Sequence, residues 1–220
     1  MGKVIDETSY RLTSKGYVKE KNTFTILKTL GEGGQGRTEI IERHRDRKTL
    51  VRKIQRNFEW IGNEAKEAFI FEKILKPHPS IVLFDHANLR DKDQWLTMYF
   101  EHCSGGDLQD WIDKYERPTE RFLWQVFIQL ADALAYLHYG VSRKYGSSRP
   151  PGWRRIVHRD VKPGNVFLRR KITTLHSTPD VVLGDFGLAT LDEVSYDCGT
   201  YSWWGPEIPK STKDGDVWGK

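Results

Sequence analysis

Segments in which apolar and polar residues alternate recur through the first hundred residues, and a period of two is typical of half-buried β-strands. Several of these segments are also rich in β-branched residues, which favour strands. We therefore expect strands over residues 23–30, 38–41, 49–54, 81–84 and 95–101. The polar residues 1–22 before them show no period, and we expect them to form a loose leader.

A helical period replaces this alternation in three places. Residues 59–76 place apolar side chains on one broad face, which predicts a helix that Pro77 would stop. Residues 108–115 predict a short helix. Residues 119–138 predict the longest helix, because apolar residues recur there about every 3.6 positions.

The order of these elements defines a fold class. A last short strand is expected at residues 181–183, so that strands come first and helices second, which indicates an α+β chain with two lobes. The boundary between the lobes is expected near residues 103–106. Residues 139–155, which we call the insert, contain glycine, serine, arginine and a Pro-Pro pair and predict an exposed loop.

The composition is that of a folded chain. Of its 220 residues, 38% are hydrophobic and 30% are charged, which argues against disorder and against a collagen-like repeat. No apolar stretch approaches the ~18 residues that cross a bilayer, so we expect no membrane partner. The two cysteines lie far apart in sequence, which excludes a disulfide framework and favours a reducing compartment, the cytoplasm or the nucleus.

The net charge of +5 raises the question of an anionic partner. A basic chain is compatible with nucleic-acid or phosphate binding, and basic residues cluster at 43–48. The same cluster also fits a solvated turn between two strands. Since the chain has no helix-turn-helix, zinc-ligand or RNA-binding aromatic signature, we do not expect a nucleic acid partner.

A glycine-rich segment, residues 31–36, lies between two predicted strands. A dinucleotide-binding fold would need a helix after it. Between strands, glycines let backbone N–H groups approach phosphate oxygens without a Cβ in the way, although an ordinary hairpin turn would also use them. Lys53, in an apolar strand, would either extend to solvent or hold an anion, and Glu67 on the next helix could pair with it.

Residues 158–165 concentrate an imidazole, two cations, a carboxylate and an amide. Asp185 follows the predicted strand 181–183 on a turn, which is a suitable place for a metal ligand. Carboxylate and amide oxygens are hard donors that suit Mg²⁺. Each aspartate taken singly could instead cap a turn, but the order and spacing of the whole set favour a catalytic site.

With these motifs in this order, residues 23–218 resemble a eukaryotic-type Ser/Thr protein kinase domain. The resemblance implies a bilobal fold over residues 23–220, with a small β-rich N-lobe (23–102), a hinge near 101–106 and a larger helical C-lobe (107–220). It also implies ATP and Mg²⁺ as cofactors and, as substrate, a protein with a Ser or Thr acceptor.

The resemblance further implies a role for each matching residue. Asp160 would be the catalytic base, Lys162 would steady the γ-phosphate, and Asn165 and Asp185 would bind Mg²⁺. The residues that would contact ATP are Gly31, Glu32, Gly33, Gly34, Gln35, Gly36, Thr38, Val51, Lys53, Glu101, Cys103, Asp107 and Phe167.

Lys53 would contact the α- and β-phosphates and pair with an acidic residue of the helix that follows. Glu67 is the expected partner because Ile70 and Phe71 follow it with the family's spacing, and Glu64 and Glu72 are the alternatives. In the same family an apolar stack joins the lobes, and a gatekeeper residue precedes the hinge. These positions match Phe71, Phe84, His158 and Phe186 for the stack and Phe100 for the gatekeeper.

The region after Asp185 is similar to an activation loop over residues 188–198. Lys162, two residues after Asp160, follows the Ser/Thr-specific pattern, and Thr200 would support Asp160. An upstream kinase would act on this loop. Its candidate acceptors are Thr190, Ser195 and Tyr196.

Three departures from the family pattern carry expectations. Thr38 replaces the usual valine, so we expect altered ATP affinity. The insert is longer than the family's turn and is either a solvated loop or a docking site for acidic partners. Residues 214–219 resemble the start of helix αF, so we expect the C-lobe to lack its last helices and some apolar side chains of helix 119–138 to face water. The candidates are Phe122, Leu123, Val126, Phe127, Leu130, Leu134 and Leu137.

Two functional hypotheses follow. The first is a Ser/Thr protein kinase that transfers the γ-phosphoryl group of ATP to a protein hydroxyl, and the intact Lys53, Asp160, Asn165 and Asp185 favour it. The second is a catalytically silent regulatory or scaffold module with an incomplete kinase fold, which the missing helices favour.

Overall fold

The chain divides into two compact units in the computed structural model. The first unit comprises residues 1–76 and 83–102, and the second comprises residues 77–82 and 103–220. Within them, the structure describes residues 2–13, 16–33, 36–56, 58–61, 64–90, 95–114, 118–171, 180–191, 199–200 and 203.

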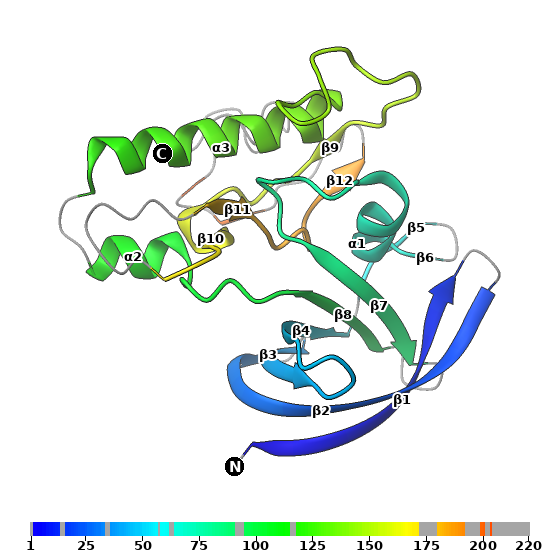
Figure 1. Ribbon diagram of the computed structural model, residues 1–220. Helices are drawn as coiled ribbons and strands as arrows, with labels where there is room; N and C mark the ends of the chain where they lie inside the picture. Colours follow the sequence, from blue (N-terminus) through cyan, green and yellow to red (C-terminus); the bar gives the residue numbers. More distant parts are fainter. Residues whose placement is uncertain are drawn as a thin grey trace. The chain divides into compact units, whose positions relative to one another are not determined.

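The first unit is built on six antiparallel strands that close into a barrel in the order β1-β2-β3-β4-β8-β7 (Figure 1). Each strand pairs with its neighbours in antiparallel register, and β1 closes the barrel by pairing with β7. The strands are β1 (Lys3–Thr13), β2 (Gly16–Gly33), β3 (Gly36–Arg43), β4 (Thr49–Gln55), β7 (Phe84–Arg90) and β8 (Trp95–Glu101).

Alternate residues of β3 and β4 are buried, as the period of two predicts. The first unit contains the hydrophobic cluster of Phe24, Ile41, Leu50 and Tyr99. One ion pair is buried beside it: Arg52 donates from Nη1 to Glu39 Oε2 at 3.2 Å, and both side chains are at most 3% exposed. The Arg52 guanidinium lies 4.4 Å from the centroid of the Phe24 ring.

The expectation of a loose leader at residues 1–22 is wrong. Residues 3–13 form β1, which pairs with β2 in continuous register from Lys3 opposite Ile26 to Thr13 opposite Gly16. Ile5 packs against the hydrophobic cluster. Cross-strand pairing stabilises such a hairpin, and this long-range contribution leaves little trace in the local polarity of the segment.

The helix expected over residues 59–76 is also much shorter in the structure. A small hairpin of β5 (Trp60–Ile61) and β6 (Glu64–Ala65) comes first, followed by α1 (Lys66–Phe69) and the π-helical turn η1 (Ile70–Ile74). The hairpin is closed at its base by Glu59, which accepts hydrogen bonds from the backbone N–H and Nζ of Lys66. These bonds hold the chain extended where the apolar periodicity predicted a helix.

The strand expected at residues 81–84 is not formed as such. Ile81 makes only an isolated bridge with Leu183, and β7 begins at Phe84. The preceding residues bond instead to one strand of the second unit: Val82 N–H donates to the Leu183 carbonyl, and Leu183 N–H donates to that of Ser80.

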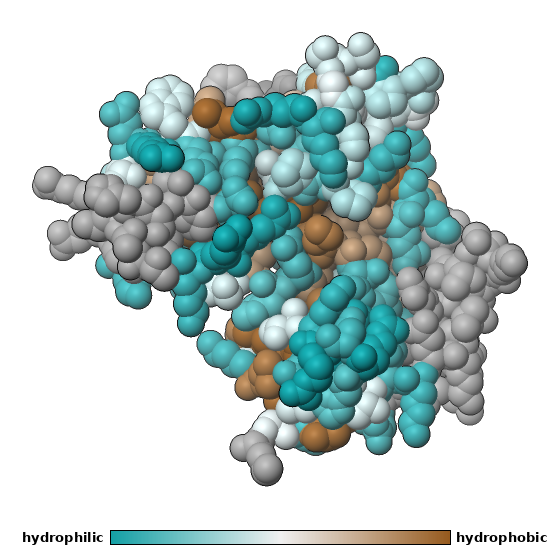
Figure 2. Space-filling view, viewed as in Figure 1, coloured by the Kyte–Doolittle hydropathy of each residue, from teal (hydrophilic) through white to brown (hydrophobic). Residues whose placement is uncertain are grey.

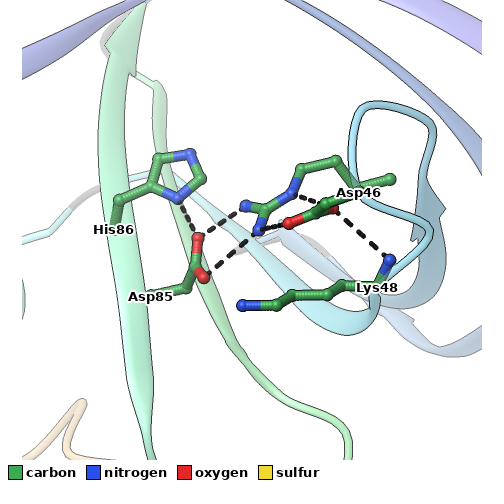
Figure 3. Close-up of polar contacts among 5 residues, drawn as sticks. Asp46, Lys48, Asp85 and His86 are labelled. Atoms are coloured by element: carbon green, nitrogen blue, oxygen red, sulfur yellow. Dashed lines mark hydrogen bonds and ion pairs between the residues drawn. The ribbon is translucent and has the colours of Figure 1, made fainter.

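Arg43 joins the end of β3 to the start of β7 (Figure 3). Its guanidinium donates to Asp46 at 2.7 and 2.9 Å and to Asp85 at 2.6 Å, and Nδ1 of His86 lies 2.6 Å from the same Asp85 oxygen. The hydrogen bonds from Arg43 lower the pKa of Asp46 to about 2. The hydrogen bond from His86, together with Arg43, outweighs burial and holds the pKa of Asp85 well below its usual range. The basic cluster noted in the sequence is thus partly neutralised inside the first unit.

The described part of the second unit contains helices α2 and α3 and two small antiparallel sheets, β10-β11 and β9-β12 (Figure 1). Helix α3 begins after Thr119, whose hydroxyl accepts the Phe122 N–H, and ends at Gly140, which adopts the left-handed conformation at φ 73°. The elements are α2 (Leu108–Lys114), α3 (Glu120–Tyr139), β9 (Ile156–Val157), the 3₁₀ turn η2 (Pro163–Asn165), β10 (Val166–Leu168), β11 (Val181–Leu183) and β12 (Thr190–Leu191).

Helix α3 has one buried and one exposed apolar face. Phe122 and Leu137 are at most 2% exposed, whereas Leu123 is 52% and Phe127 is 65% exposed. The prediction that some apolar side chains of this helix face water is therefore confirmed by Leu123 and Phe127. On the face drawn in Figure 2, hydrophilic residues cover most of the described surface, with smaller hydrophobic patches between them. In the described part of the chain, no helix has the length and apolar character needed to cross a membrane.

Candidate active site

The glycine-rich segment connects β2 to β3. Gly31 pairs with Thr38 and Gly33 with Gly36, while Gly34 and Gln35 lie outside the described residues. Gly36 has φ 146°, and a Cβ on it would stand 1.9 Å from the Ile54 carbonyl oxygen, so that only glycine fits there. Around Gly31 and Gly33 the corresponding space is open within 4 Å, which leaves their backbone accessible to a ligand. Glu32, between them, is exposed.

Strand β4 presents Lys53 on the same face as Thr38 and Val51. Thr38 is the register partner of Lys53, and Val51 is two residues away on the strand. Lys53 Nζ donates to both carboxylate oxygens of Glu67 at 3.0 Å. Glu67 comes from α1 and its side chain is 4% exposed, while that of Lys53 is 17% exposed. The structure thus places Glu67, the expected partner, on Lys53.

Three aromatic side chains of the first unit pack against one another. Phe71 stacks on Phe84 with ring centroids 5.2 Å apart, and Phe100 meets both rings edge-on at 5.3 and 5.6 Å. In the second unit, His158 meets the ring of Phe186 edge-on at 4.8 Å. The contacts Phe71–Phe84 and His158–Phe186 thus join members of the expected apolar stack within each unit.

The segment expected to be the hinge is held by reciprocal hydrogen bonds in the first unit. Glu101 N–H donates to the Leu83 carbonyl at 2.8 Å, and its Oε1 accepts the Leu83 N–H at 2.8 Å. Beyond it, Cys103 is half-buried and its carbonyl accepts the Gly106 N–H. Asp107 caps α2, because its Oδ1 accepts the Asp110 N–H at 2.8 Å. Sequence reasoning missed the role of the Glu101 side chain, which joins positions 18 residues apart without a local pattern.

Asp160 lies at the centre of a network of polar contacts in the second unit. Oδ1 accepts the backbone N–H and the hydroxyl of Thr200 at 2.9 and 2.8 Å. Oδ2 accepts from Asn165 Nδ2 and Lys162 Nζ, both at 2.9 Å. Lys162 Nζ also donates to the Thr200 hydroxyl at 2.6 Å. Both carboxylate oxygens are thus fixed by neighbours from two separate stretches of the chain.

This network determines the ionisation of Asp160. The residue is only 9% exposed, and its burial alone would raise the pKa. The hydrogen bonds from Lys162, Thr200 and Asn165 outweigh that effect together, and the pKa of Asp160 is lowered. The carboxylate is therefore ionised at neutral pH and can accept a hydrogen bond from an approaching hydroxyl.

Asn165 and Asp185 are brought together by the pairing of β10 with β11. Gly184 N–H donates to the Asn165 carbonyl at 2.9 Å, and Asp185 follows directly at φ 56° with an exposed side chain. Asn165 uses Nδ2 for both hydrogen bonds to Asp160. Its Oδ1 is the oxygen that a metal ion could take as a ligand. A Cβ on Gly184 would stand 2.8 Å from the ring of Phe167, the half-buried residue expected to contact ATP.

This donor set fits Mg²⁺. No group of three or more His, Cys, Asp or Glu residues that could enclose a metal occurs among the described residues. Mg²⁺ rarely requires such a cage, because it keeps waters and phosphate oxygens and takes only one or two protein ligands. One carboxylate and one amide oxygen match that preference.

The segment after Asp185 is described only in part. Arg159, at φ 66°, donates from Nε to the Leu188 carbonyl at 2.8 Å, and β12 pairs with β9 beside it. Thr190, in β12, is 8% exposed, so that its hydroxyl is not presented as an acceptor in this conformation. The remaining predicted positions of this region lie outside the described residues: Ser195, Tyr196, Cys198 and residues 205–220.

Comparison with known proteins agrees with this geometry. The model of the family described as "Protein kinase domain" matches residues 24–219. The chain therefore belongs to the protein kinase domain family.

Curated relatives refine the comparison. The chain is 32% identical to the G2-specific protein kinase nim-1 of Neurospora crassa over 91% of its length. It is 33% identical to the G2-specific protein kinase nimA of Emericella nidulans over 90% of its length, and 33% identical to the human serine/threonine-protein kinase Nek2 over 76%. It spans only 26%, 31% and 36% of the lengths of these three relatives, respectively.

Proposed function

We propose that this chain is an ATP- and Mg²⁺-dependent Ser/Thr protein kinase domain that transfers the γ-phosphoryl group to protein hydroxyls. The observation that carries the proposal is the fixed, ionised carboxylate of Asp160, with Lys162 Nζ and the side-chain amide of Asn165 on the same carboxylate oxygen. Phosphoryl transfer needs little covalent chemistry from the protein, because catalysis consists mainly of alignment and charge neutralisation.

The proposed roles follow from the geometry of each unit. Asp160 accepts the proton of the substrate hydroxyl, and Lys162, bonded to it, stays close to the transferred phosphoryl group. Asn165 and Asp185 would hold Mg²⁺, which neutralises charge on the phosphate oxygens when bound. Lys53, oriented by Glu67, contacts the α- and β-phosphates.

The nucleotide is proposed to bind along the first unit and its hinge. The open backbone at Gly31 and Gly33 supports phosphate contacts, while Thr38 and Val51 share a face with Lys53. The remaining contacts that we propose are Glu32, Gly34, Gln35, Gly36, Glu101, Cys103, Asp107 and Phe167. We propose a kinase domain over residues 23–220, with β1 as an addition that closes its sheet.

The substrate is proposed to be a protein with a Ser or Thr acceptor, since Lys162 follows the Ser/Thr pattern and the relatives compared above include kinases named for that specificity. Regulation by an upstream kinase at Thr190 or Ser195 belongs to the same proposal. The low cysteine content supports localisation in the cytoplasm or the nucleus.

A label-transfer assay tests this function. The 220-residue chain is incubated with γ-labelled ATP, Mg²⁺ and casein, and in parallel with excess EDTA. We expect label on casein that EDTA abolishes and that added Mg²⁺ restores. A chain that binds ATP but transfers no label under any of these conditions would favour the catalytically silent alternative.

A further inference from the structure

The insert, residues 139–155, carries the entire net charge of the chain. It contains five basic residues and no Asp or Glu, whereas the rest of the chain contains 30 basic and 30 acidic residues. The formal charge of the insert is therefore +5, equal to that of the whole protein. Such a concentration of one sign of charge attracts partners of the opposite sign. The five basic residues are Arg143, Lys144, Arg149, Arg154 and Arg155.

The other basic cluster of the sequence, residues 43–48, differs from the insert. There Arg43 and Arg47 form ion pairs with carboxylates of the first unit at 2.6 to 2.9 Å. Asp132 of α3 does contact the insert, but its carboxylate is only 10% exposed and accepts the backbone N–H of Arg143 at 2.8 Å. This carboxylate therefore supports the backbone of the insert, and the Arg143 side chain above it is exposed.

The turn that carries the first two basic residues has a fixed backbone. Ser142 and Gly146 exchange two backbone hydrogen bonds at 2.8 and 3.0 Å, and the Ser142 hydroxyl accepts the Lys144 N–H at 3.2 Å. Lys144 Nζ is used within the second unit, where it donates to the Pro77 carbonyl. Arg143 is thus the basic residue that this turn presents to solvent.

The second half of the insert is fixed to the end of α3. Trp153 donates from Nε1 to the Leu137 carbonyl at 3.2 Å, and a Cβ on Gly140 would stand 2.6 Å from the Trp153 ring. Arg149 donates from Nη2 to the Trp153 carbonyl at 3.2 Å, which orients the guanidinium and uses one of its five N–H donors. Arg149 and Arg154 are both exposed. In Figure 1 the insert is the yellow-green loop beyond the C-terminal end of α3.

This arrangement favours a ligand with several anionic groups in close succession. Because the backbone below the cations is fixed, binding does not have to order the loop, which reduces its entropy cost. A guanidinium binds a carboxylate or a phosphate in a bidentate manner. An acidic peptide segment supplies such groups over a short length. A duplex nucleic acid carries a charge about every 1.7 Å and is matched better by an extended basic track, which a chain without net charge outside the insert does not provide.

The insert leads directly into the candidate catalytic residues. Arg155 precedes β9, and Asp160 lies five residues after Arg155, so their Cα atoms are at most ~18 Å apart. A linker of about ten residues spans up to ~35 Å. A protein segment bound at the insert can therefore carry an acceptor hydroxyl that reaches Asp160.

We propose that the insert is a docking surface for an acidic segment of the protein substrate, which binds through Arg143, Arg149 and Arg154. The use of this surface by substrates rests on the proposed function. The binding of an acidic segment does not, and it can be measured without kinase activity.

Fluorescence anisotropy of a labelled peptide of eight glutamates measures docking on the 220-residue chain. We expect Arg143→Gln/Arg149→Gln/Arg154→Gln, the triple Gln variant, to bind this peptide at least about tenfold more weakly, because three cations are lost. Binding by the wild-type chain should also weaken as the ionic strength rises from about 0.05 to about 0.3 M, since salt screens the attraction.

Matched variants separate position from net charge. Lys21→Gln/Arg45→Gln/Lys48→Gln removes three exposed charges from the first unit and should leave the Kd of the peptide within about threefold of the wild-type value. The triple Lys variant at the three insert arginines keeps the charge and should retain most of the binding. A labelled twelve-nucleotide oligothymidylate, measured in parallel, tests the nucleic-acid alternative.

Steady-state kinetics test the substrate role. A Ser acceptor peptide that the wild-type chain labels is extended by a Gly-Ser linker of about ten residues and the eight glutamates. The KM of this peptide should rise about tenfold in the triple Gln variant, with kcat changed less than about twofold. With eight glutamines in place of the glutamates, the KM should be the same for both chains.

Each outcome decides one part of the proposal. Equal Kd values of the glutamate peptide for the wild-type chain and the triple Gln variant would overturn the docking surface. Tighter binding of the oligothymidylate through the same three arginines would overturn the assignment to an acidic protein segment. Weaker docking with an unchanged KM would overturn the substrate role. A wild-type chain without kinase activity would contradict the proposed function, whereas the anisotropy would still decide whether the insert binds an acidic segment.

Discussion

At the scale of single residues, the carboxylate of Asp160 is the group whose environment is most closely specified. Four donors from Lys162, Asn165 and Thr200 hold its two oxygens, and they keep it ionised although it is buried. An ionised, immobile carboxylate loses no orientational freedom when it receives a substrate hydroxyl. Under the proposed function, this preorganisation would let Asp160 orient the substrate hydroxyl that it accepts.

Replacement of that carboxylate should separate chemistry from binding. We expect Asp160→Asn to lower kcat by ~10²–10⁴, the usual contribution of a positioned acid–base group, with the Kd of ATP nearly unchanged. Initial-rate kinase assays measure kcat, and calorimetric titration measures the Kd of ATP. Asp113→Asn, at an exposed carboxylate on α2, is the control. Wild-type turnover in Asp160→Asn would show that another group is the base.

Three variants test whether the ion pair of Lys53 and Glu67 is needed for phosphoryl transfer. Lys53→Met should abolish detectable transfer, because the phosphates lose their positioning charge, and Glu67→Lys should do the same by displacing Lys53. Glu72→Lys, at a half-buried position on the following turn, should retain far more activity than Glu67→Lys. The three variants are compared by initial rates at saturating ATP. If Glu72→Lys alone abolished activity, Glu67 would not be the functional partner.

At the scale of elements, the β2–β3 connection depends on two glycines for different reasons. Gly36 has φ 146° and no room for a Cβ, so Gly36→Ala should destabilise the first unit by about 1–3 kcal/mol. Gly31 has open space, so Gly31→Ala should leave the melting temperature unchanged and weaken ATP binding by crowding the phosphates. Thermal unfolding and ATP titration distinguish them. Equal melting temperatures for both variants would contradict this difference.

The Arg43 network should make the stability of the first unit depend on pH. Because the folded-state pKa of Asp46 is about 2, below its unfolded value of ~3.9, its contribution is fully present above pH ~4 and is lost as the pH falls toward 2. Arg43→Met should cost about 3 kcal/mol at pH 7, because it leaves carboxylates without their partner. Urea unfolding at a series of pH values should show that this difference shrinks between pH 5 and 2. A constant difference would contradict the assignment.

Local patterns predicted the elements whose stability is local. Strands β3, β4, β8 and β11 were expected from alternation or apolar runs, and α3 from its period. Strand β1 was missed because it depends on pairing with residues up to 23 positions away. The helix after β4 was predicted too long because the Glu59–Lys66 bonds, which close a hairpin before it, leave no periodic signal.

Local sequence patterns likewise predicted only part of the candidate site. Asp160, Lys162 and Asn165 lie within six residues, so that their motif could be read directly from the sequence. The choice of Glu67 over its neighbours required a spacing argument, and the structure places it on Lys53. The contacts of Lys144 and Tyr145 with Pro77 join positions 67 and 68 residues apart and had no sequence signal at all.

At the scale of the whole molecule, the exposed apolar side chains of α3 should govern solution behaviour. Leu123, Trp124, Phe127 and Ile128 are each more than 40% exposed along one helix, and contiguous apolar surface promotes association. We expect the 220-residue chain to associate at high concentration and Leu123→Gln/Phe127→Gln to be more monodisperse, with a melting temperature within about 2 °C. Light scattering and thermal unfolding measure both. A monodisperse wild-type chain at high concentration would contradict this expectation.

The account as a whole rests on phosphoryl transfer to a Ser or Thr hydroxyl by the Asp160 site. The most direct test is phosphoamino-acid analysis of casein labelled by the wild-type chain with γ-labelled ATP and Mg²⁺, beside Asp160→Asn as a control. The account predicts phosphoserine or phosphothreonine from the wild-type chain and label reduced by at least about 100-fold from the variant. Phosphotyrosine as the main product, or equal labelling by both chains, would contradict it.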